Sequence, residues 1–459
     1  MEMVIHMKKE LNVGFITTLS GRWPIKLPEK RREEYGNWLD ETFPDLNIVK
    51  ADRLIDSGQA VDQTVERFRR ESVDVLVMVY GAFTGDDIPS VFAEELGIPV
   101  LLWAPYEPPF DRDDRLYANA LVAATMNAAS LKRLGHTSHV IYGGLDDGRA
   151  RSRVQSLIRA YSVIKKLNGT LLGLLGYRPT AFYNSTFDEG LIRRTFGVRI
   201  EETDLAIVFD RMGRIPEDQV RSDMEGVSGT FDTSRLPKGH LENHSRLYFA
   251  LKEIMGEKGY DYATIKCWPE MGELHTTPCA VMGRLADEDS HLVCEGDVDA
   301  ALALVVENYL TGLPAFICDM INIDETENLL TYWHCGNAAL SLFDKEDGVT
   351  INDHPLAGQG TAFYGALKPG KVTVARFCNI DGQYKLFLVS GEAVKTKRNT
   401  GGVMVNVRPK APVRGILERI IREGVPHHYS IVWQDVAEEM KTIGELLGLE
   451  IIECGDECR

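Results

Sequence analysis

Apolar runs alternate with segments of helical periodicity through the first third of the chain, and each run is short enough to form one strand. The runs predict strands at 11–18, 46–51, 73–81, 98–105 and 140–144. The segments between them predict helices, among them one over about 28–43 and one over about 117–134. The run at 73–81 is almost entirely apolar, so we expect a central strand that is covered on both faces. Short links between alternating strands and helices predict a doubly wound parallel sheet.

A second alternation of strands and helices follows a long helix expected over about 151–167. Strands are expected near 169–177 and 198–204, with a helix between them that ends at Gly197. Charged helical sequence is expected from 216 to 251. This pattern predicts a second α/β unit.

The stretch 290–319 has the clearest pattern in this second unit. Apolar runs at 291–294 and 314–318 predict two strands, and apolar residues recur between them at helical spacing. We expect the two strands to lie parallel in one sheet, joined by a right-handed crossover through the helix. The runs end in Glu295 and Asp319, so both carboxylates are expected at the carboxyl edge of that sheet, where open α/β sheets bind ligands.

The pattern changes after about residue 325, where helical periodicity fades. Short alternating runs separated by turn residues predict an antiparallel sheet or barrel, at 360–367, 371–380 and 384–394. The sequence therefore predicts an α/β protein with two doubly wound parallel-sheet domains followed by a C-terminal β-rich domain that is antiparallel or barrel-like. The expected domain bounds are 1–165, 166–325 and 326–459.

Composition narrows the class of protein. A hydrophobic content of 44% and a charged content of 26% are typical of globular chains. The formal net charge of −17 argues against nucleic acid and anionic membrane as partners. Because the chain has no apolar run of about 18 residues and no secretory apolar segment near its start, we expect a cytoplasmic protein with no membrane partner.

The eight cysteines all lie at or after Cys267, and disulfides are not expected in this context. Cys294 and Cys318 fall inside predicted buried strands, where a thiol behaves as a small apolar group. Near the end, Cys454 and Cys458 are either a metal or redox pair or an incidental pair in an exposed tail.

Other strand ends carry candidate binding residues. No strand is followed by GxGxxG or a Walker sequence, so a nucleotide site is not expected. After the first strand, Arg22 and Trp23 could clamp a polar ligand or merely rim the sheet. Among 11 histidines, His334 and the adjacent His427 and His428 are the candidates for chemistry, since each lies next to a predicted strand.

Two carboxylates and an imidazole on neighbouring loops suit a divalent metal with open coordination positions. Either acid alone is as well explained as a helix cap or a solvated strand end. A carboxylate-rich set favours manganese or magnesium over zinc. A metal that chelates a carbonyl and the neighbouring hydroxyl acidifies the C–H group between them, and carboxylates nearby could then move the proton.

These residues resemble the ligand set of the L-fucose isomerase and L-arabinose isomerase superfamily, which are metal-dependent aldose–ketose isomerases. Glu295 in CEGD matches the family's first metal ligand, a Glu that begins a helix after a strand. Asp319 in AFICD matches the second, and His428 in PHHYSIVW matches the third. The resemblance implies that these three residues bind Mn²⁺, or another divalent cation such as Mg²⁺ or Co²⁺. It also implies that Glu295 and Asp319 move a proton between C1 and C2 of an open-chain aldose through a cis-enediol.

The resemblance also implies substrate-binding residues and an assembly. The segment SGRWP resembles the family's Gly-Arg loop, which reaches substrate, often in a neighbouring subunit. A homo-oligomer, hexamer or trimer, with active sites at subunit contacts is therefore implied. The substrate-binding candidates are Arg22, Trp23, Arg178, Lys266, Trp268, Cys335 and His427.

The chain also departs from the family pattern. It is shorter than typical fucose isomerases, His427 stands where the family has an Asn, and Cys335 lies near the place of a serine. The resemblance thus implies a divergent branch and leaves the sugar open. A deoxy-hexose, a pentose or an anionic C6-modified hexose such as sulfoquinovose would each be compatible.

Two alternatives to an isomerase remain at this level. Two α/β domains resemble solute-binding proteins in outline, so a non-catalytic sugar-binding or regulatory protein is possible. A metal-dependent epimerase or aldolase would use the same enediolate chemistry. The sequence does not assign the base between the two carboxylates.

Overall fold

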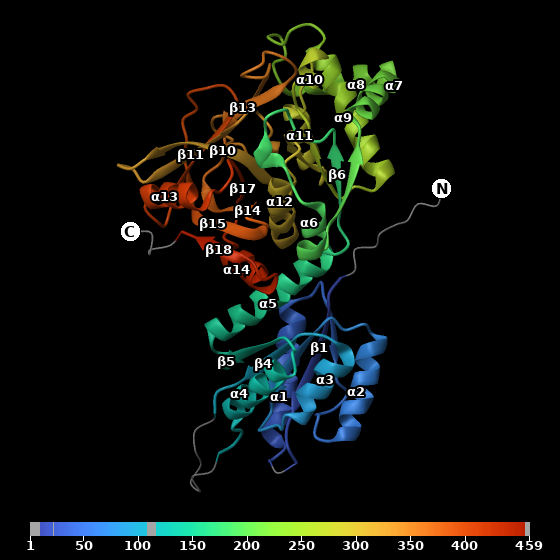
Figure 1. Cartoon of the computed structure of the whole chain (residues 1–459), viewed down its shortest axis with the longest axis vertical. Coiled ribbons are helices and arrows are strands. Elements are labelled where there is room, and N and C mark those ends of the chain that lie inside the picture. The colour runs from blue at the N-terminus through green and yellow to red at the C-terminus, as the bar shows by residue number, and fades with distance from the viewer. Residues whose placement is uncertain (1–9, 22, 108–115, 455–459) are drawn as a thin grey trace. The chain divides into compact units, whose positions relative to one another are not determined.

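Figure 1 presents the protein as a computed structural model that describes residues 10–21, 23–107 and 116–454. The chain divides into two compact units, one of residues 8–165 and one that takes in the chain from Lys166 onward. The architecture is α/β in both units, with parallel sheets and a large C-terminal β sheet, as the sequence predicts.

The unit of residues 8–165 is built on five parallel strands in the order β2-β1-β3-β4-β5. Helices connect the strands, which gives the doubly wound pattern that the alternation predicts. The elements are β1 (Asn12–Thr18), α1 (Lys26–Thr42), β2 (Asn47–Lys50), α2 (Gly58–Arg70), β3 (Val75–Tyr80), α3 (Asp87–Leu96), β4 (Val100–Ala104), α4 (Ala120–Arg133), β5 (Ser138–Tyr142) and α5 (Gly148–Leu167).

The central strand β3 is buried at every residue, because both faces of the sheet are covered. Val75, Val77 and Val79 pack with α1 and α5, whereas Leu76 and Met78 pack with α2, α3 and α4. The prediction of a central strand at 73–81 is therefore confirmed.

The second unit begins with a smaller parallel sheet in the order β7-β6-β8-β9. Helix α6 ends at Gly197 in the left-handed conformation, as predicted. Helix α7 was not predicted. The elements of this part are β6 (Leu171–Leu175), α6 (Glu189–Phe196), β7 (Arg199–Thr203), α7 (Leu205–Arg214), α8 (Glu217–Thr230), α9 (His240–Lys258), β8 (Tyr262–Ile265), α10 (Glu270–Glu273), α11 (Cys279–Ala286), β9 (His291–Cys294) and α12 (Val298–Thr311).

The prediction that the two strands of 290–319 lie parallel in one sheet is wrong. Strand, helix and strand form as expected, but β9 is an edge strand of the parallel sheet, and β10 (Ala315–Asp324) lies in the C-terminal sheet. There β10 pairs antiparallel with β11 (Leu329–His334) and β17 (His428–Val432). A run of four or five apolar residues predicts a buried strand without specifying its partner, and tertiary packing decided the pairing here.

Six strands of the C-terminal sheet close into an antiparallel barrel. The pairings run β10–β11, β11–β16, β16–β15, β15–β14, β14–β17 and back from β17 to β10. Strands β13 and β18 are added in parallel to β16 and β15. The remaining elements are β12 (Thr350–Asn352), β13 (Ala362–Ala366), β14 (Gly370–Ile380), β15 (Gln383–Val394), β16 (Val403–Pro409), α13 (Val413–Glu423), α14 (Ala437–Leu446) and β18 (Glu450–Glu453).

Helix α12 is almost wholly buried and joins the two sheets of this unit (Figure 1). It packs against β14 and β17 of the barrel and against β8 and β9 of the parallel sheet. The Asp297 side chain caps its first turn by accepting the Ala300 N–H, and Gly312 ends it at φ 67°. The helix therefore fixes the spacing between Glu295, which precedes it, and the barrel strands.

Two further observations bear on the sequence analysis. Within the described ranges, each helix is too short or too polar to cross a membrane. Cys454 is buried rather than part of an exposed tail, because it follows β18 into the core. Its proposed partner Cys458 lies outside the described residues.

Candidate active site and metal centre

Glu295 lies on the tight turn between β9 and α12. Its backbone is in the left-handed region at φ 63°, which is costly for a residue with a side chain. Gly296 follows at φ 62°, and a Cβ atom there would lie 2.0 Å from the carbonyl oxygen of Tyr177. This turn therefore requires the glycine, and it leaves the Glu295 side chain 14% exposed.

Asp319 and His428 are cross-strand neighbours in the barrel. Their Cα atoms are partners in the antiparallel register of β10 and β17, so the two side chains leave the same face of the sheet. His428 begins its strand and is 1% exposed, whereas Asp319 is 28% exposed. Two residues that are distant in sequence are thus brought together by strand pairing.

Two of the predicted ligands, Glu295 and Asp319, each lie close to the third, His428. Oε2 of Glu295 lies 3.4 Å from Nε2 of His428, and Oδ1 of Asp319 lies 3.8 Å from the same nitrogen. Each of these three atoms is buried and has no hydrogen-bond partner in the described part of the chain. Buried polar atoms are rarely left unpaired, so these three atoms around His428 indicate a missing ligand.

The donor set fits a divalent cation. A metal with ligand bonds of roughly 2.0–2.2 Å can bridge nitrogen and oxygen atoms separated by the distances found here. The ligand atoms of Glu295, His427 and His428 all lie within 4.8 Å of one another, a set that does not include Asp319. Two carboxylates and one imidazole favour a cation such as Mn²⁺ over a thiolate-seeking one. The coordination roles themselves stay predictions.

A buried carboxylate orients the His428 ring. Nδ1 of His428 lies 2.8 Å from Oδ2 of Asp297, and Nη1 of Arg376 lies 2.8 Å from the same oxygen. Since Asp297 as a carboxylate only accepts, Nδ1 carries the proton and Nε2 presents a lone pair to Glu295 and Asp319.

The charged groups shift each other's pKa values. Burial opposes ionisation of Asp297, but Arg376 and His428 outweigh it and hold the pKa of that carboxyl well below its ordinary value. For Glu295, burial is likewise outweighed, here by His427 and His428, so its pKa is also lowered. Burial opposes protonation of His428, yet Asp297, Glu295 and Asp319 raise its pKa. Asp297 and Glu295 are therefore ionised at neutral pH.

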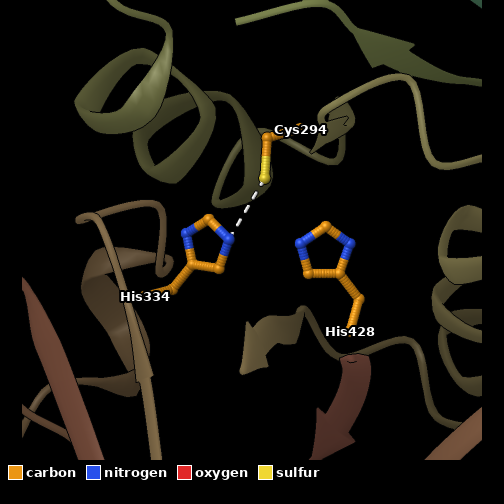
Figure 2. Close-up of side chains that lie close together, drawn as sticks. All are labelled: Cys294, His334 and His428. Carbon is orange, nitrogen blue, oxygen red and sulfur yellow. Dashed lines mark hydrogen bonds between the residues drawn. The ribbon is translucent and has the colours of Figure 1, made fainter. Parts of the chain in front are cut away.

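His334 lies beside this set, with Cys294 and His428 around it (Figure 2). Its Nε2 atom lies 3.4 Å from Sγ of Cys294, and its Nδ1 atom accepts the N–H of Cys335 at 2.9 Å. In the neutral ring Nε2 thus carries the proton, and the ring would have to change tautomer before Nε2 could coordinate. Burial lowers the pKa of His334, which keeps the ring neutral.

A cavity of about 530 Å³ opens onto the site. Its walls come from the parallel sheet's loops and from the barrel. The lining residues are Phe182, Cys267, Trp268, Pro269, Gly272, Thr277, Cys279, Cys294, Glu295, Asp319, Trp333, His334, Cys335, His354, Leu356, Ala357 and His427.

Three of the predicted substrate-binding residues line this cavity, namely Trp268, Cys335 and His427. Lys266 instead forms an ion pair with Glu270 and does not line it. The Arg178 guanidinium lies over the rings of Tyr177 and Tyr183, at 5.5 and 5.3 Å from their centroids.

The remaining two candidates belong to the other unit. Trp23 packs against Leu19, Leu54 and Ala82 and lines a separate cavity of about 920 Å³ there. Arg22 lies outside the described residues. The substrate-binding roles of both residues stay predictions.

Sequence reasoning missed the groups that support the ligands. Asp297 follows Glu295 by two residues and was not singled out, and Arg376 is a charged residue within a mostly apolar strand of the barrel. A lone arginine at an inward position of a predicted buried strand was the available signal. His354 was also missed; burial lowers its pKa to about 4, so it lines the cavity as a neutral ring.

The cavity also contains four thiols, but their chemistry is suppressed. Burial raises the pKa of Cys279 and Cys335 well above the ordinary value, and it does the same for Cys267 and Cys294. At neutral pH these groups are thiols, which are weak nucleophiles and weak ligands. The carboxylates and imidazoles are therefore the reactive groups of this cavity.

Known proteins resemble the chain over most of its length. The family of fucose/sulfoquinovose isomerases, by its N-terminal domain, matches residues 14–126. A sulfoquinovose isomerase of Alkalicoccus urumqiensis is 28% identical over 382 residues, which cover 83% of this chain and 86% of the relative. One of Clostridium sp. (strain MSTE9) is 28% identical over 385 residues, 82% and 85% of the two chains. One of Priestia aryabhattai is 23% identical over 428 residues, 93% and 95%.

Among solved structures, the periplasmic binding protein component of the arabinose ABC transporter from Shewanella sp. ANA-3 matches at 12% identity with a TM-score of 0.15, over 66% of this chain and 86% of that one. This structural similarity is too low to bear on fold or function.

These comparisons support the resemblance to the fucose isomerase-like superfamily, and the named relatives are isomerases that act on a sugar. The identities of 23–28% agree with the divergent branch that the sequence resemblance implies.

Proposed function

We propose that this protein is a metal-dependent aldose–ketose isomerase in which Glu295, Asp319 and His428 hold a divalent cation, Mn²⁺ in the first instance. The observation that carries the proposal is that Nε2 of His428 and one oxygen each of Glu295 and Asp319 are buried and unpartnered, with the two oxygens 3.4 and 3.8 Å from that nitrogen. A sugar-binding module would have no need to leave two carboxylates and an imidazole unpaired in this way.

A cation held there would polarise a sugar carbonyl and the neighbouring hydroxyl, which lowers the pKa of the C–H group between them. Glu295 and Asp319 then exchange the proton between C1 and C2 by way of a cis-enediol. His427 lies 3.7 Å from Glu295, so it can help to hold that carboxylate ionised. Buried walls around Cys294 and His334 keep bulk water from the reacting carbons.

Sulfoquinovose is the substrate that we favour, because all three relatives described above carry the name sulfoquinovose isomerase. Its sulfonate requires cationic or N–H donors, and the described lining of the cavity has no Lys or Arg. Arg178 and Arg22 are therefore the candidates for the anionic end of the sugar, with Trp268 and Cys335 against its ring.

The same proposal includes a cytoplasmic homo-oligomer, hexameric or trimeric, with active sites at subunit contacts. The Arg22 and Trp23 loop would then serve the active site of a neighbouring copy. Light scattering at several protein concentrations tests the assembly, and a monomer at micromolar concentration contradicts it.

The activity test uses chelator-treated protein with and without added Mn²⁺. Sulfoquinovose, its uncharged parent hexose and a 6-deoxy-hexose are supplied in turn, and proton NMR in D₂O identifies the products. We expect a 2-ketose only with metal, with deuterium incorporated at the position that receives the proton. An epimer or a cleaved product would instead indicate an epimerase or an aldolase.

Glu295→Gln provides the matched variant, since the amide keeps the shape of the side chain and removes its charge. We expect loss of turnover with an unchanged unfolding temperature. Full activity of this variant, or a metal-loaded enzyme that is silent on every sugar tested, would end the isomerase proposal.

A further inference from the structure

Arg376 is a fully buried cation in the barrel. It lies on β14 at 0% exposure, and it does not line the cavity. Its Nη1 atom lies 2.8 Å from Oδ2 of Asp297, while Nε and Nη2 have no hydrogen-bond partner in the described part of the chain. Burying an ion pair is costly, and an apolar pair of similar volume is often equally stable. A stability role alone therefore accounts poorly for this arginine.

The bonds of Asp297 connect Arg376 to the metal centre. Oδ1 of Asp297 accepts the N–H of Ala300 at 2.9 Å and so caps α12. Oδ2 accepts from both Arg376 and Nδ1 of His428. One carboxylate is thus fixed by the helix on one side and by the arginine on the other, and its remaining bond goes to the ligand imidazole.

We propose that Arg376 is a positioning residue that holds Asp297 as the acceptor for Nδ1–H of His428, and that it thereby keeps Nε2 of His428 as a lone pair facing Glu295 and Asp319. The inference rests on the proposed function, because it assigns a role in the same metal centre. Without the arginine, Oδ2 loses its strongest donor, and the carboxylate can turn away or the imidazole can move its proton to Nε2.

The surroundings of Arg376 explain why an arginine is suited to this place. Asp299, two residues after Asp297, is a second buried acid near the guanidinium, and it accepts the hydroxyl of Tyr384 at 2.7 Å. A guanidinium stays protonated when buried, whereas a buried ammonium readily loses its proton. Arg376 therefore supplies a permanent charge among two carboxylates, one imidazole and one phenol.

The first test measures metal affinity rather than activity. Mn²⁺ is titrated calorimetrically into the chelator-treated full chain, as wild type, Arg376→Met and Arg376→Lys. We expect Arg376→Met to weaken Mn²⁺ binding about 10- to 100-fold, as the loss of supporting groups around metal ligands does, and Arg376→Lys to restore part of it. Mn²⁺ affinity of Arg376→Met within about twofold of wild type overturns the positioning role.

Arg284→Met is the matched control. Arg284 also pairs with an aspartate of the same unit, at 2.7 and 3.0 Å from the oxygens of half-buried Asp223, but it lies outside the metal centre. We expect this variant to unfold at a lower temperature with unchanged Mn²⁺ affinity. If it weakens Mn²⁺ binding as much as Arg376→Met does, the effect is general destabilisation and the proposal fails.

A second readout needs no metal. In ¹⁵N-histidine-labelled, metal-free protein, held at a pH where the His428 ring is neutral, the His428 signals are identified by their loss in His428→Gln, and their shifts report which nitrogen carries the proton. We expect Nδ1–H in wild type and movement toward Nε2–H in Arg376→Met, or in Arg376→Lys if the methionine variant does not fold. An unchanged tautomer overturns the inference. If wild type binds no Mn²⁺, the proposed function fails, and the tautomer alone decides the role of Arg376.

Discussion

Nδ1 of His428 lies 2.8 Å from Oδ2 of Asp297, and both side chains are 1% exposed. One residue begins a barrel strand and the other caps the helix that leads into the barrel. The hydrogen bond therefore joins two elements and sets which nitrogen of the imidazole is free. A ligand whose tautomer is fixed before metal arrives loses no binding energy to reorganisation.

Asp297→Asn tests that bond. The amide oxygen can still cap α12, but the amide N–H₂ facing Nδ1 favours the tautomer with the proton on Nε2. We expect Mn²⁺ affinity to fall about 10- to 100-fold while the far-ultraviolet circular dichroism spectrum is unchanged. Calorimetric titration measures the affinity, and wild-type binding by this variant would contradict the assigned tautomer.

Metal affinity should depend on pH through His428. Its pKa is raised above the ordinary histidine value, and only the neutral ring can coordinate. Below that raised pKa, Mn²⁺ must displace a proton, so affinity should fall about tenfold for each further unit of acidification. Titrations in two buffers of different ionisation enthalpy count the released proton. A pH-independent affinity across the neutral range would exclude His428 as a ligand.

Asp299 should make stability fall as pH rises. Burial raises its pKa to about 7, so the folded state binds a proton that the unfolded chain releases near its ordinary carboxyl pKa. The stabilising contribution is complete below the unfolded pKa and is lost as pH rises through about 7. We expect Asp299→Asn to gain in unfolding temperature relative to wild type between pH 5 and pH 8. A difference in unfolding temperature between the two proteins that stays the same from pH 5 to pH 8 would contradict the raised pKa of Asp299.

We expect Gly296→Ala to disrupt the candidate site, whereas alanine at an unconstrained glycine should leave it intact. Its Cβ would meet the Tyr177 carbonyl at 2.0 Å, so the turn that places Glu295 must move. We expect turnover and Mn²⁺ affinity to be lost together. Gly312→Ala is the control at the other end of α12: it has the same backbone sign at φ 67° and open space around it. This variant should cost roughly 1–2 kcal/mol of stability and keep its activity.

The sequence predicted those parts of the fold that depend on local pattern. The fully apolar run around Val77, the helix stop at Gly197 and the alternating barrel strands each follow from spacing and turn chemistry. The ligand candidates were found because Glu295 and Asp319 end strands and because the motifs around them resemble a known family. The residue types at the strand ends and the motifs around them were therefore enough to identify the ligand candidates.

The pattern of apolar and polar residues did not predict which distant segments pair with each other. The run that forms β10 gave no sign that it would join β11 and β17 rather than β9, because strand partners are chosen by packing. For the same reason Arg376 could not be linked to Asp297, which lies on a different element. The contacts that orient a ligand side chain are therefore set by the tertiary structure and cannot be read from the local sequence.

The separation of β9 from β10 makes α12 a rigid spacer in the proposed metal centre. Glu295 is carried by the parallel sheet and Asp319 by the barrel, and the buried helix between them sets the gap that a cation must fill. Ionic radius could thus be selected by packing rather than by ligand identity. A single methylene added or removed among Leu302, Val305 and Val306 would alter which metal fits best, although none of these side chains is a proposed ligand.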